Sequence, residues 1–392
     1  MEQVVVLGAG LSGMITALHL LSEGIKPILL DKINLAQAEF CLDNRTTALT
    51  NRSILLLRKI GVFEKLQQYL TPVKEVYIVD NHSASELLQL SSDGLGGEIG
   101  YIIKNKDFKS VLAQVVLEEI DFNLANYVNL IAHEDHTTVV LDEKSEVHAQ
   151  LAILCDADFN RAIKDQYFCY RVEKQYHQKS VVFDVCHEKP HSNAALEHFL
   201  PSGPLALLPL CSEHQSNVVW SMDDQSFGLF ERLNNDERAS MLEEYTGYFL
   251  GAMRVIEPHM PDIHASDDWV RHHSYNLIAK IAENYFYNRV VLVSDSAHIL
   301  HPIAGQGFNQ GMKDIESLCW NLHISGINTD ALIAYEQQRK MNNLFMYHLT
   351  NSINGIFLNQ SLVLSAIRKK GLKLLSTCSY GKRWFVQYVN SL

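Results

Sequence analysis

The segment VVVLGAGLSGMITALHLL, from Val4 to Leu21, decides the fold of this chain. Its apolar start predicts a buried strand over residues 4–7, and residues 11–22 are typical of a helix. The spacing Gly8-x-Gly10-x-x-Gly13 stands between them, and a second apolar run ends at Asp31. A strand, a glycine turn, a helix and a second strand that ends in an acidic residue predict a βαβ unit that binds a dinucleotide.

Each glycine of this turn has a structural role that explains why glycine is needed there. Gly8 makes the bend, Gly10 lets the backbone approach a pyrophosphate, and Gly13 lets the helix pack closely on the strand. The free N–H groups at the start of the helix then face the negative charge. Asp31 would accept a hydrogen bond from a ribose hydroxyl. A tight turn without a ligand is the alternative, and the flanking elements favour binding.

A later segment, HPIAGQGFNQGMKD from His301 to Asp314, repeats this logic. The strand-like run RVVLVSD ends at Asp295, Pro302 fixes a turn, and Gly305-Gln306-Gly307 opens a helix. A helix start carries roughly half a positive charge. It suits an anionic ring edge, such as that of a reduced flavin, although an ordinary glycine-rich helix start is the alternative. We expect both turns to hold the same cofactor.

Length and composition restrict the class of protein. A chain of 392 residues suits two domains, and its apolar runs fall short of the ~18 residues that a spanning helix needs. The net charge of −12 argues against nucleic acid as a partner. Seven scattered cysteines favour neither a disulfide framework nor a zinc site. The N-terminus resembles no signal peptide, so we expect a cytoplasmic location.

The middle of the chain changes character. Short strand-like runs such as SVVFDVCHE, GPLALLPL and SNVVWSM are separated by Pro, Gly, Ser and Asn, which is typical of an antiparallel sheet. Helical periodicity between residues 50 and 66, and again between 107 and 119, lies upstream of it. The sequence therefore predicts an α/β fold in which a Rossmann-like domain is interrupted by an inserted antiparallel β-sheet domain.

Several blocks of the sequence, in order, carry a resemblance to a known family. The segment NRVVLVSDSAHILHPIAGQGFNQGMKDIESL resembles the late flavin motif of the para-hydroxybenzoate hydroxylase superfamily, and specifically of its ubiquinone-biosynthesis FAD-dependent hydroxylases of the 2-polyprenyl-6-methoxyphenol hydroxylase type. DNRTTALTNRSILLLRKIGVF is similar to the family's arginine-bearing segment, and GYIIKNKDFKSVL to its central strand and helix. YHQKSVVFDVCHEKPHSNAALEHFLPSGPLALLPL resembles its substrate-domain sheet, and AYEQQRKMNN and RKKGLKLL its C-terminal helices.

The resemblance implies a division of the chain. It places a discontinuous FAD-binding domain at 1–75, 101–172 and 269–345, substrate-domain strands at 76–100, the substrate domain at 173–268, and C-terminal helices at 346–392.

The resemblance also implies roles for individual residues. Gly8, Gly10, Gly13 and Asp31 would hold the adenosine diphosphate half of FAD. Arg45 would approach the cofactor, and Asp295 its ribityl chain. Gly305, Gln306 and Gly307, with Asn309, would lie at the isoalloxazine ring. His301 and Pro302 would border the face where the substrate reacts, as the catalytic residues.

Two motifs depart from the family pattern. The family's Ala-Asp-Gly corresponds here to CDADFNRAI, in which Asp156 can be aligned but Ala157 replaces the glycine. The family's Gly-Asp-Ala-Ala-His corresponds to Ser294-Asp295-Ser296-Ala297-His298. The first motif is tied to the handling of the nicotinamide cofactor and the flavin, so its change puts the efficiency of flavin reduction in question.

The implied activity is that of an FAD-dependent aromatic monooxygenase in ubiquinone biosynthesis. NADPH or NADH would reduce FAD, oxygen would add at flavin C4a, and one oxygen atom would pass to a polyprenylated phenol, a hydrophobic phenolic substrate. Two alternatives remain: a flavin-binding or inactive scaffold protein of a quinone-biosynthesis complex, and a hydroxylase of a soluble aromatic acid. The sequence leaves open whether the chain forms a homo-oligomer.

The C-terminal region is basic. No Asp or Glu follows Glu336, whereas eight basic residues do: Arg339, Lys340, Arg368, Lys369, Lys370, Lys373, Lys382 and Arg383. Apolar residues interleaved with cations suit an anionic membrane surface or a partner enzyme. A helix pair packed on the flavin domain is the alternative. We expect a cytoplasmic protein for which contact with the inner membrane stays open.

Histidine pairs give no metal site. His133 with His136, and His298 with His301, have spacings that would serve a metal on a helix, but neither pair has clear further ligands. We therefore predict no bound metal.

Overall fold

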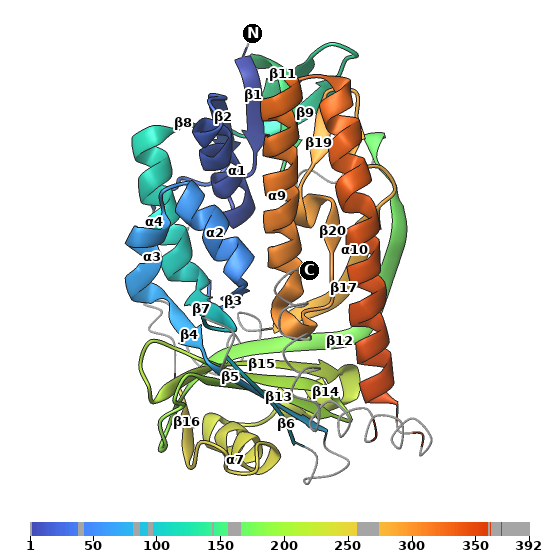
Figure 1. Ribbon diagram of the computed structural model, residues 1–392. Coiled ribbons are helices and arrows are strands. Elements are labelled where there is room, and N and C mark those ends of the chain that lie inside the picture. The colour runs from blue at the N-terminus through green and yellow to red at the C-terminus, as the bar shows by residue number, and fades with distance from the viewer. Residues whose placement is uncertain are drawn as a thin grey trace.

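The computed structural model describes residues 2–37, 43–80, 87–92, 97–142, 145–155, 166–256 and 274–359, together with 361 and 370. Figure 1 shows two large sheets, one in the upper half of the molecule and one crossing below it, with long helices beside the upper sheet.

The upper sheet has a parallel centre. Its strands are β1 (Glu2–Leu7), β2 (Pro27–Asp31), β8 (Asp121–Leu124), β9 (Tyr127–Ala132), β10 (Thr137–Leu141), β11 (Glu146–Leu154), β18 (Phe286–Tyr287) and β19 (Val290–Leu292). β1 pairs in parallel with β2 on one side and β11 on the other, and β11 pairs in parallel with β19. Val4, Val5 and Val6 are fully buried, as expected for a parallel strand covered on both faces. The predicted first strand is confirmed.

Helices complete this domain. They are α1 (Leu11–Ser22), α2 (Asn51–Lys59), α3 (Phe63–Leu66), α4 (Asn105–Glu119), α9 (Gln306–Ser325) and α10 (Thr329–Leu358). α1 contacts both α4 and α9, and α9 contacts α10 along its length (Figure 1). The helical pattern predicted over residues 50–66 is interrupted in the structure, because Gly61 has a φ of +73° and ends α2. A left-handed residue of this kind is a usual helix stop.

The lower sheet is mainly antiparallel. Its strands are β5 (Glu75–Asp80), β6 (Leu87–Ser91), β12 (Tyr170–His187), β13 (Ala194–Leu200), β14 (Gly203–Pro209), β15 (Gln215–Asp223), β16 (Met253–Val255), β17 (Ser274–Ala282) and β20 (His298–Ile299). One face packs on α6 (Asp224–Phe230) and α7 (Asn235–Tyr245) around the buried Trp220. The other face turns toward the upper domain, so the predicted α/β fold with an inserted antiparallel sheet is confirmed.

A small sheet and one long helix connect the two halves. β3 (Thr46–Leu49), β7 (Gly100–Lys104) and β4 (Thr71–Val73) form the small sheet. α10 continues without a break through residues 345 and 346, where the family resemblance implies a domain limit, and the helix contacts β13 and β14. This helix therefore contacts both domains.

None of the helices that the structure describes combines the length and the apolar character needed to cross a bilayer.

Candidate functional site

The first glycine turn lies between β1 and α1. Gly8 has a φ of +96°, and a Cβ atom on Gly13 would stand 1.7 Å from the carbonyl oxygen of Gly8. Only glycine fits at that contact. Gly10 precedes α1 without a side-chain cap, and a Cβ atom there would meet nothing within 4 Å. The N–H groups of the first turn of α1 lack intrahelical partners, and the space beside Gly10 is open.

Asp31 stabilises this turn. Its Oδ2 accepts a hydrogen bond from the backbone N–H of Ala9, and its Oδ1 accepts one of 2.8 Å from Ile33. Asp31 is 7% exposed. Because each oxygen has a further lone pair, a ribose contact is compatible with this arrangement. The predicted ribose role stays a prediction.

The late motif begins at a strained residue. Ser294 follows β19 with a φ of +60°, and this is the position where the family pattern has glycine. Its Oγ accepts a hydrogen bond of 2.9 Å from Ser12 Oγ in the first turn of α1. A Cβ atom on Gly311 would stand 2.1 Å from Ser294 Oγ, so α9 packs directly on this serine. Sequence motifs almost 300 residues apart therefore meet at Ser12 and Ser294.

The start of α9 resembles the start of α1. Gly305 adopts a left-handed conformation with a φ of +59° and gives no side-chain cap, and a Cβ atom on Gly307 would meet nothing within 4 Å. Gln306 is buried at the first position of the helix. A second helix start thus presents backbone N–H groups beside open space.

Asn309 fixes this turn in place. Its Nδ2 donates to the carbonyl oxygens of Ala48 and Gly305, and its Oδ1 accepts from Thr50 N and Ser53 Oγ, at 2.7–3.0 Å. The whole hydrogen-bonding capacity of the amide is used within the protein. Asn309 therefore joins α9 to β3 and α2.

Arg45 and Asp295 lie near each other beside these turns. Arg45 Nη2 is 2.8 Å from Asp43 Oδ2, and Lys109 Nζ is 3.0 Å from the same oxygen. Burial opposes ionisation of Asp43, but the hydrogen bond from Arg45 and the charges of Arg45 and Lys109 hold its pKa well below its usual range. The hydrogen bond from Arg45 to Asp43 raises the pKa of the guanidinium, and the nearby Asp295 adds to this. Asp295 itself is exposed.

His301 is fully buried where the late motif meets the lower sheet. Its Nδ1 accepts a hydrogen bond from Ile303 N, so its Nε2 carries the proton and donates to Gln178 Oε1 at 3.4 Å. Burial, with a smaller effect from the charge of Lys174, lowers the pKa of His301 to about 4. The ring is therefore neutral at pH 7. Pro302 begins the short helical turn Ile303–Gly305, and its carbonyl accepts from Gly305 N at 3.0 Å.

A pair of buried amides lies next to His301. Asn354 Nδ2, on the last turns of α10, donates to Gln178 Oε1 on β12 at 3.1 Å, and the two residues are 4% and 5% exposed. Gln178 Nε2 and Asn354 Oδ1 have no partner in the part of the chain that the structure describes. Because His301 Nε2 donates to Gln178 Oε1, the orientation of the Gln178 amide is fixed with its oxygen toward the imidazole.

Tyr176 extends this polar cluster. Its ring meets that of His301 edge to face at 4.7 Å, and its buried hydroxyl has no hydrogen-bond partner among the described residues. Burial raises the pKa of Tyr176 to about 12. His177 has a φ of +54° where the pairing of β12 with β17 shifts register. Bulges of this kind often occur beside active sites, where they redirect a side chain.

A buried ionic network holds the late motif. Asp314 on α9 accepts 2.7 Å hydrogen bonds from His298 Nε2 and Arg339 Nε, and a 3.0 Å bond from Asn343. Burial opposes ionisation of Asp314, but the charges of His298 and Arg339 lower its pKa to about 2. This network ties α9, α10 and the residues after β19 together. His298 is thus committed to a carboxylate, and the residues described contain no cluster of three side chains suited to a metal.

The sequence predicts the two glycine turns but not the contacts that connect them. Ser12, Ser294, Asp314, Arg339, Gln178 and Asn354 carry the contacts above, and none was singled out as a site residue. The one available signal was the serine that replaces glycine at position 294. Asp156, Ala157 and most of the basic C-terminal segment lie outside the described residues.

The residues present fit FAD. Two helix starts without side-chain caps offer N–H groups to anionic parts of a ligand. The positions next to them, at Gly10 and Gly307, are open to a bulky neighbour. Because the Ser12–Ser294 contact brings α1 against the late motif, one extended dinucleotide can lie along both.

Comparisons with known proteins agree with this geometry. Residues 1–342 match the profile of the family described as "FAD binding domain". A ubiquinone hydroxylase, UbiL of Rhodospirillum rubrum, is 27% identical over 98% of this chain and 88% of its own length. The mitochondrial ubiquinone biosynthesis monooxygenase COQ6 of Dictyostelium discoideum is 24% identical over 96% of this chain and 88% of its own.

Among solved structures, p-nitrophenol 4-monooxygenase PnpA of Pseudomonas putida superposes with a TM-score of 0.78 and 17% identity. The match covers 100% of this chain and 98% of that one, which supports the fold. With most of its length matched by the profile and both glycine turns in place, the chain belongs to the FAD binding domain family.

Proposed function

We propose that the protein is an FAD-dependent aromatic monooxygenase that hydroxylates a polyprenylated phenol in ubiquinone biosynthesis, with NADPH or NADH as electron donor. The observation that supports this proposal is the contact of Ser12 with Ser294, which brings the first turn of α1 against the late motif. Two relatives that align with nearly the whole chain bear the names of a ubiquinone hydroxylase and a ubiquinone biosynthesis monooxygenase.

The cofactor would be held in two places. The first turn of α1, with Gly8, Gly10 and Gly13, would bind the pyrophosphate, and Asp31 would keep that turn in shape while accepting from a ribose hydroxyl. The exposed Asp295 would meet the ribityl chain, near Arg45. Gly305, Gln306 and Gly307 would lie at the isoalloxazine, with Asn309 fixing their position from behind.

When bound, FAD would supply the redox chemistry: it would accept hydride from the nicotinamide and activate oxygen for transfer to an aromatic ring. The chain's own residues orient the reactants and set the electrostatics. The N–H groups at the start of α9 would stabilise negative charge at the ring edge nearest to them. His301 and Pro302 would border the reacting face, where the neutral imidazole donates to Gln178.

The polar cluster beside His301 favours a neutral phenol. Tyr176, Gln178 and Asn354 offer one amide donor group, one amide acceptor and one hydroxyl, none of them charged. Buried groups without partners cost about 1–3 kcal/mol each, so a ligand that reached and satisfied them would gain affinity. A phenolic oxygen can both accept and donate, and it suits this set better than a carboxylate does.

Two further expectations belong to this proposal. The division of the chain into FAD-binding and substrate parts follows the family pattern. The basic residues between 360 and 392 would meet an anionic membrane surface or a partner enzyme of quinone synthesis. Of these, only Lys370 is described, and it is exposed.

The test uses the purified protein loaded with FAD. We expect a flavin absorbance spectrum, oxidation of NADPH or NADH that a short-chain prenylated phenol stimulates, and a product that contains one oxygen atom from labelled dioxygen. The matched comparison is 4-hydroxybenzoate, a soluble aromatic acid. A protein that binds FAD but oxidises neither phenol would contradict the proposal and favour a scaffold role. Greater turnover of 4-hydroxybenzoate would favour the soluble acid as substrate.

A further inference from the structure

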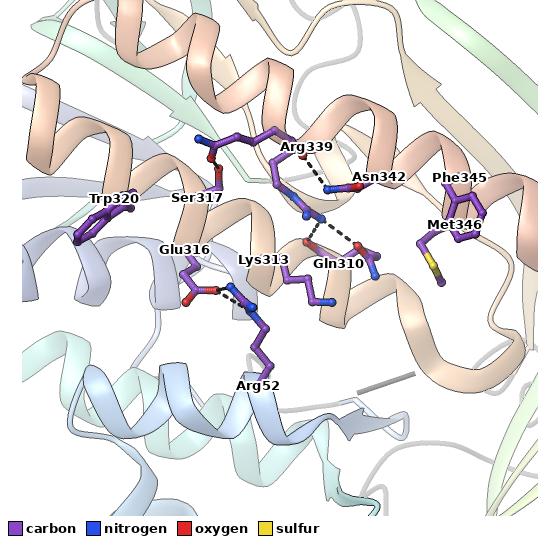
Figure 2. A pocket seen from close by; sticks show the side chains of 11 residues that line it. Arg52, Gln310, Lys313, Glu316, Ser317, Trp320, Arg339, Asn342, Phe345 and Met346 are labelled. Carbon is purple, nitrogen blue, oxygen red and sulfur yellow. Dashed lines mark hydrogen bonds and ion pairs between the residues drawn. The ribbon is translucent and has the colours of Figure 1, made fainter. Parts of the chain in front are cut away.

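Two kinds of charged group lie away from the cofactor path. A hollow on the outer side of α9 contains the first kind (Figure 2): Arg52 pairs with Glu316 at 2.8 Å, and Arg339 donates to the buried Asp314 at 2.7 Å. These charges are balanced within the protein. Glu197, on β13 of the lower sheet, is the second kind, because it forms no ion pair or hydrogen bond with any residue that the structure describes.

The side chain of Glu197 lies on the face of the lower sheet that turns toward the upper domain. Successive residues of a strand alternate between its two faces. Ala195, two positions before Glu197, packs in one apolar cluster with Ile102 of β7. Phe199, two positions after Glu197, stacks on Phe357 of α10, with 3.8 Å between the ring centroids. Glu197 therefore shares the face on which the proposed cofactor site lies.

The centre of this face keeps accessible surface, which we call the central opening. Glu197 is partly exposed, whereas all other residues of β13 are buried. Glu197 pairs with Ala206 on β14, and Ala206 pairs in turn with the partly exposed Val219 on β15. Leu208, the next residue of β14 on this face, is partly exposed as well. Because neighbouring strands lie about 4.8 Å apart, this row of three residues spans about 10 Å, which is wide enough for an aromatic ring.

The central opening lies close to the proposed isoalloxazine site. Leu208 and Ala48 pack against the same small apolar cluster. A Cβ atom on Gly305 would stand 3.0 Å from the Cβ atom of Ala48. One alanine therefore separates this cluster from the start of α9, where we place the flavin ring.

The amide pair lies at the other end of the same strands. Leu200, three residues after Glu197, pairs with Gly203 at the start of β14. A Cβ atom on Gly203 would stand 3.1 Å from Gln178 Nε2, the amide nitrogen that has no partner among the described residues. This nitrogen thus lies beside the turn between β13 and β14, and Glu197 lies further along the same two strands.

The elements around the central opening bring no free cation among their described residues. β14 consists of Gly, Pro, Leu and Ala, and α10 has no Asp, Glu, Lys or Arg at residues 341–358. On the same face, Asp184 of β12 pairs with Lys104 of β7 at 2.6 Å. Asp80, at the end of β5, is buried, and its charge acts on the buried His198. None of these groups balances a charge on β13.

Burial raises the pKa of Glu197 to about 7. The carboxyl group is therefore about half ionised at neutral pH. A second negative charge beside it would meet like-charge repulsion in poorly solvated surroundings. A neutral group would meet no such repulsion, and a hydroxyl could donate a hydrogen bond to the carboxylate.

We propose that Glu197 is a specificity-determining residue that admits uncharged phenols to the site and excludes aromatic acids. This role deepens the function proposed above and rests on it. A phenol whose hydroxyl meets Gln178 directs the opposite side of its ring over the central opening. An alkyl chain or a hydroxyl is accepted there, and a carboxylate is repelled.

Ligand binding to the FAD-loaded protein tests this role without turnover. The probes are 4-hydroxyphenylacetate and its neutral amide, 4-hydroxyphenylacetamide, whose phenol groups stay protonated up to pH 8 because their pKa resembles that of tyrosine, about 10. Calorimetry at pH 6, 7 and 8 gives the ratio of the Kd of the acid to that of the amide. We expect this ratio to rise about tenfold from pH 6 to pH 8, as Glu197, with its pKa of about 7, loses its proton.

Two variants separate this role from a general effect of charge. Glu197→Gln keeps the shape of the side chain and removes its charge, so the ratio should be low and independent of pH. Glu75→Gln is the matched control, because Glu75 lies on the neighbouring β5 and accepts from Tyr77, which packs on the opposite face of the sheet. It should behave like the wild type. Retained flavin absorbance and a cooperative thermal transition show that each variant is folded.

Three results would overturn the proposal: a ratio that does not change with pH in the wild type, the wild-type pH dependence in Glu197→Gln, or binding of neither probe. Failure of the proposed function gives a different result. A protein that shows the pH-dependent ratio but oxidises no phenol is not a hydroxylase, although its Glu197 selects ligands by charge.

Discussion

Ser12 Oγ lies 2.9 Å from Ser294 Oγ, and this hydrogen bond joins the two glycine turns although 282 residues separate them in the chain. Ser294 makes this contact with a φ of +60°. This conformation costs a residue with a Cβ atom about 1 kcal/mol or more. Ser294 thus links the two glycine turns of the proposed cofactor site although its own backbone is strained.

Replacing Ser294 separates the strain from the hydrogen bond. Ser294→Ala loses the bond and keeps the strain, so we expect a loss of about 1 kcal/mol in the free energy of unfolding. Ser294→Gly also loses the bond but relieves the strain, and it should be more stable than the alanine variant by about 1 kcal/mol. Urea unfolding measures both, with Ser12→Ala as the control that removes the bond alone. An alanine variant as stable as the glycine variant would show that the backbone is unstrained.

Gly10 and Gly13 should respond differently to alanine. A Cβ atom on Gly13 would overlap the carbonyl oxygen of Gly8, so Gly13→Ala should destabilise the apoprotein by more than about 2 kcal/mol. Gly10→Ala places its Cβ atom in open space, and we expect an unchanged apoprotein melting temperature with FAD affinity reduced at least tenfold. Flavin titration and thermal melts give the two readouts. Normal FAD affinity in Gly10→Ala would place the pyrophosphate elsewhere.

Stability should fall with acid because of His301. Its folded pKa of about 4 lies below the ordinary value of 6.5. Between these values the unfolded chain takes up a proton that the folded protein does not, so stability falls as the pH drops from 6.5 to 4, by up to about 3 kcal/mol. Above pH 6.5 the residue has no such effect. Urea unfolding at pH 7, 6 and 5 measures how the free energy of unfolding changes with pH. This change should be smaller in His301→Gln than in the wild type, and equal changes would contradict the prediction.

The amide pair should determine how well a phenol binds. In Gln178→Leu and Asn354→Leu we expect a KM for the prenylated phenol at least tenfold higher, with FAD affinity unchanged, because each variant removes one side of the polar cluster. The double variant should lose less than the sum of the two, as expected for residues in direct contact. Purely additive effects, or a change in kcat alone, would argue that the pair only packs the two domains together.

Asp314 should be essential to the folded state. Asp314→Asn leaves Arg339 buried without a countercharge, and breaking such a pair costs about 3–5 kcal/mol. Glu316→Gln, two residues further along α9, breaks only the half-exposed pair with Arg52 and should cost less than about 1 kcal/mol. Chemical unfolding of the two variants compares the costs directly, and similar losses would mean that the buried network contributes little.

The sequence predicts the local parts of this structure well. The first strand, the glycine turn and the first helix follow from residues close together in the chain, because a positive φ at Gly8 and the close approach at Gly13 require glycine. The family resemblance adds the order of the larger blocks. The single positive φ at Gly61, which divides a continuous apolar pattern into α2 and α3, leaves no trace in the periodicity.

The polar contacts between distant residues could not be predicted in the same way. Gln178 and Asn354 lie 176 positions apart, and each alone reads as a surface amide. Asp314 and Arg339 likewise resemble ordinary helix-surface charges until packing removes them from water. Such pairs depend on how distant elements pack against each other, and this information is absent from any short segment.

The two attachment points of α10 limit how the domains of the enzyme can move relative to each other. Arg339 fastens the helix to α9 of the upper domain, and Asn354, about 22 Å further along at 1.5 Å per residue, fastens it to the lower sheet. A straight rod attached at both points resists hinge bending between the domains. We therefore expect substrate to enter through local displacement of loops around a fixed frame, and product to leave by the same kind of movement.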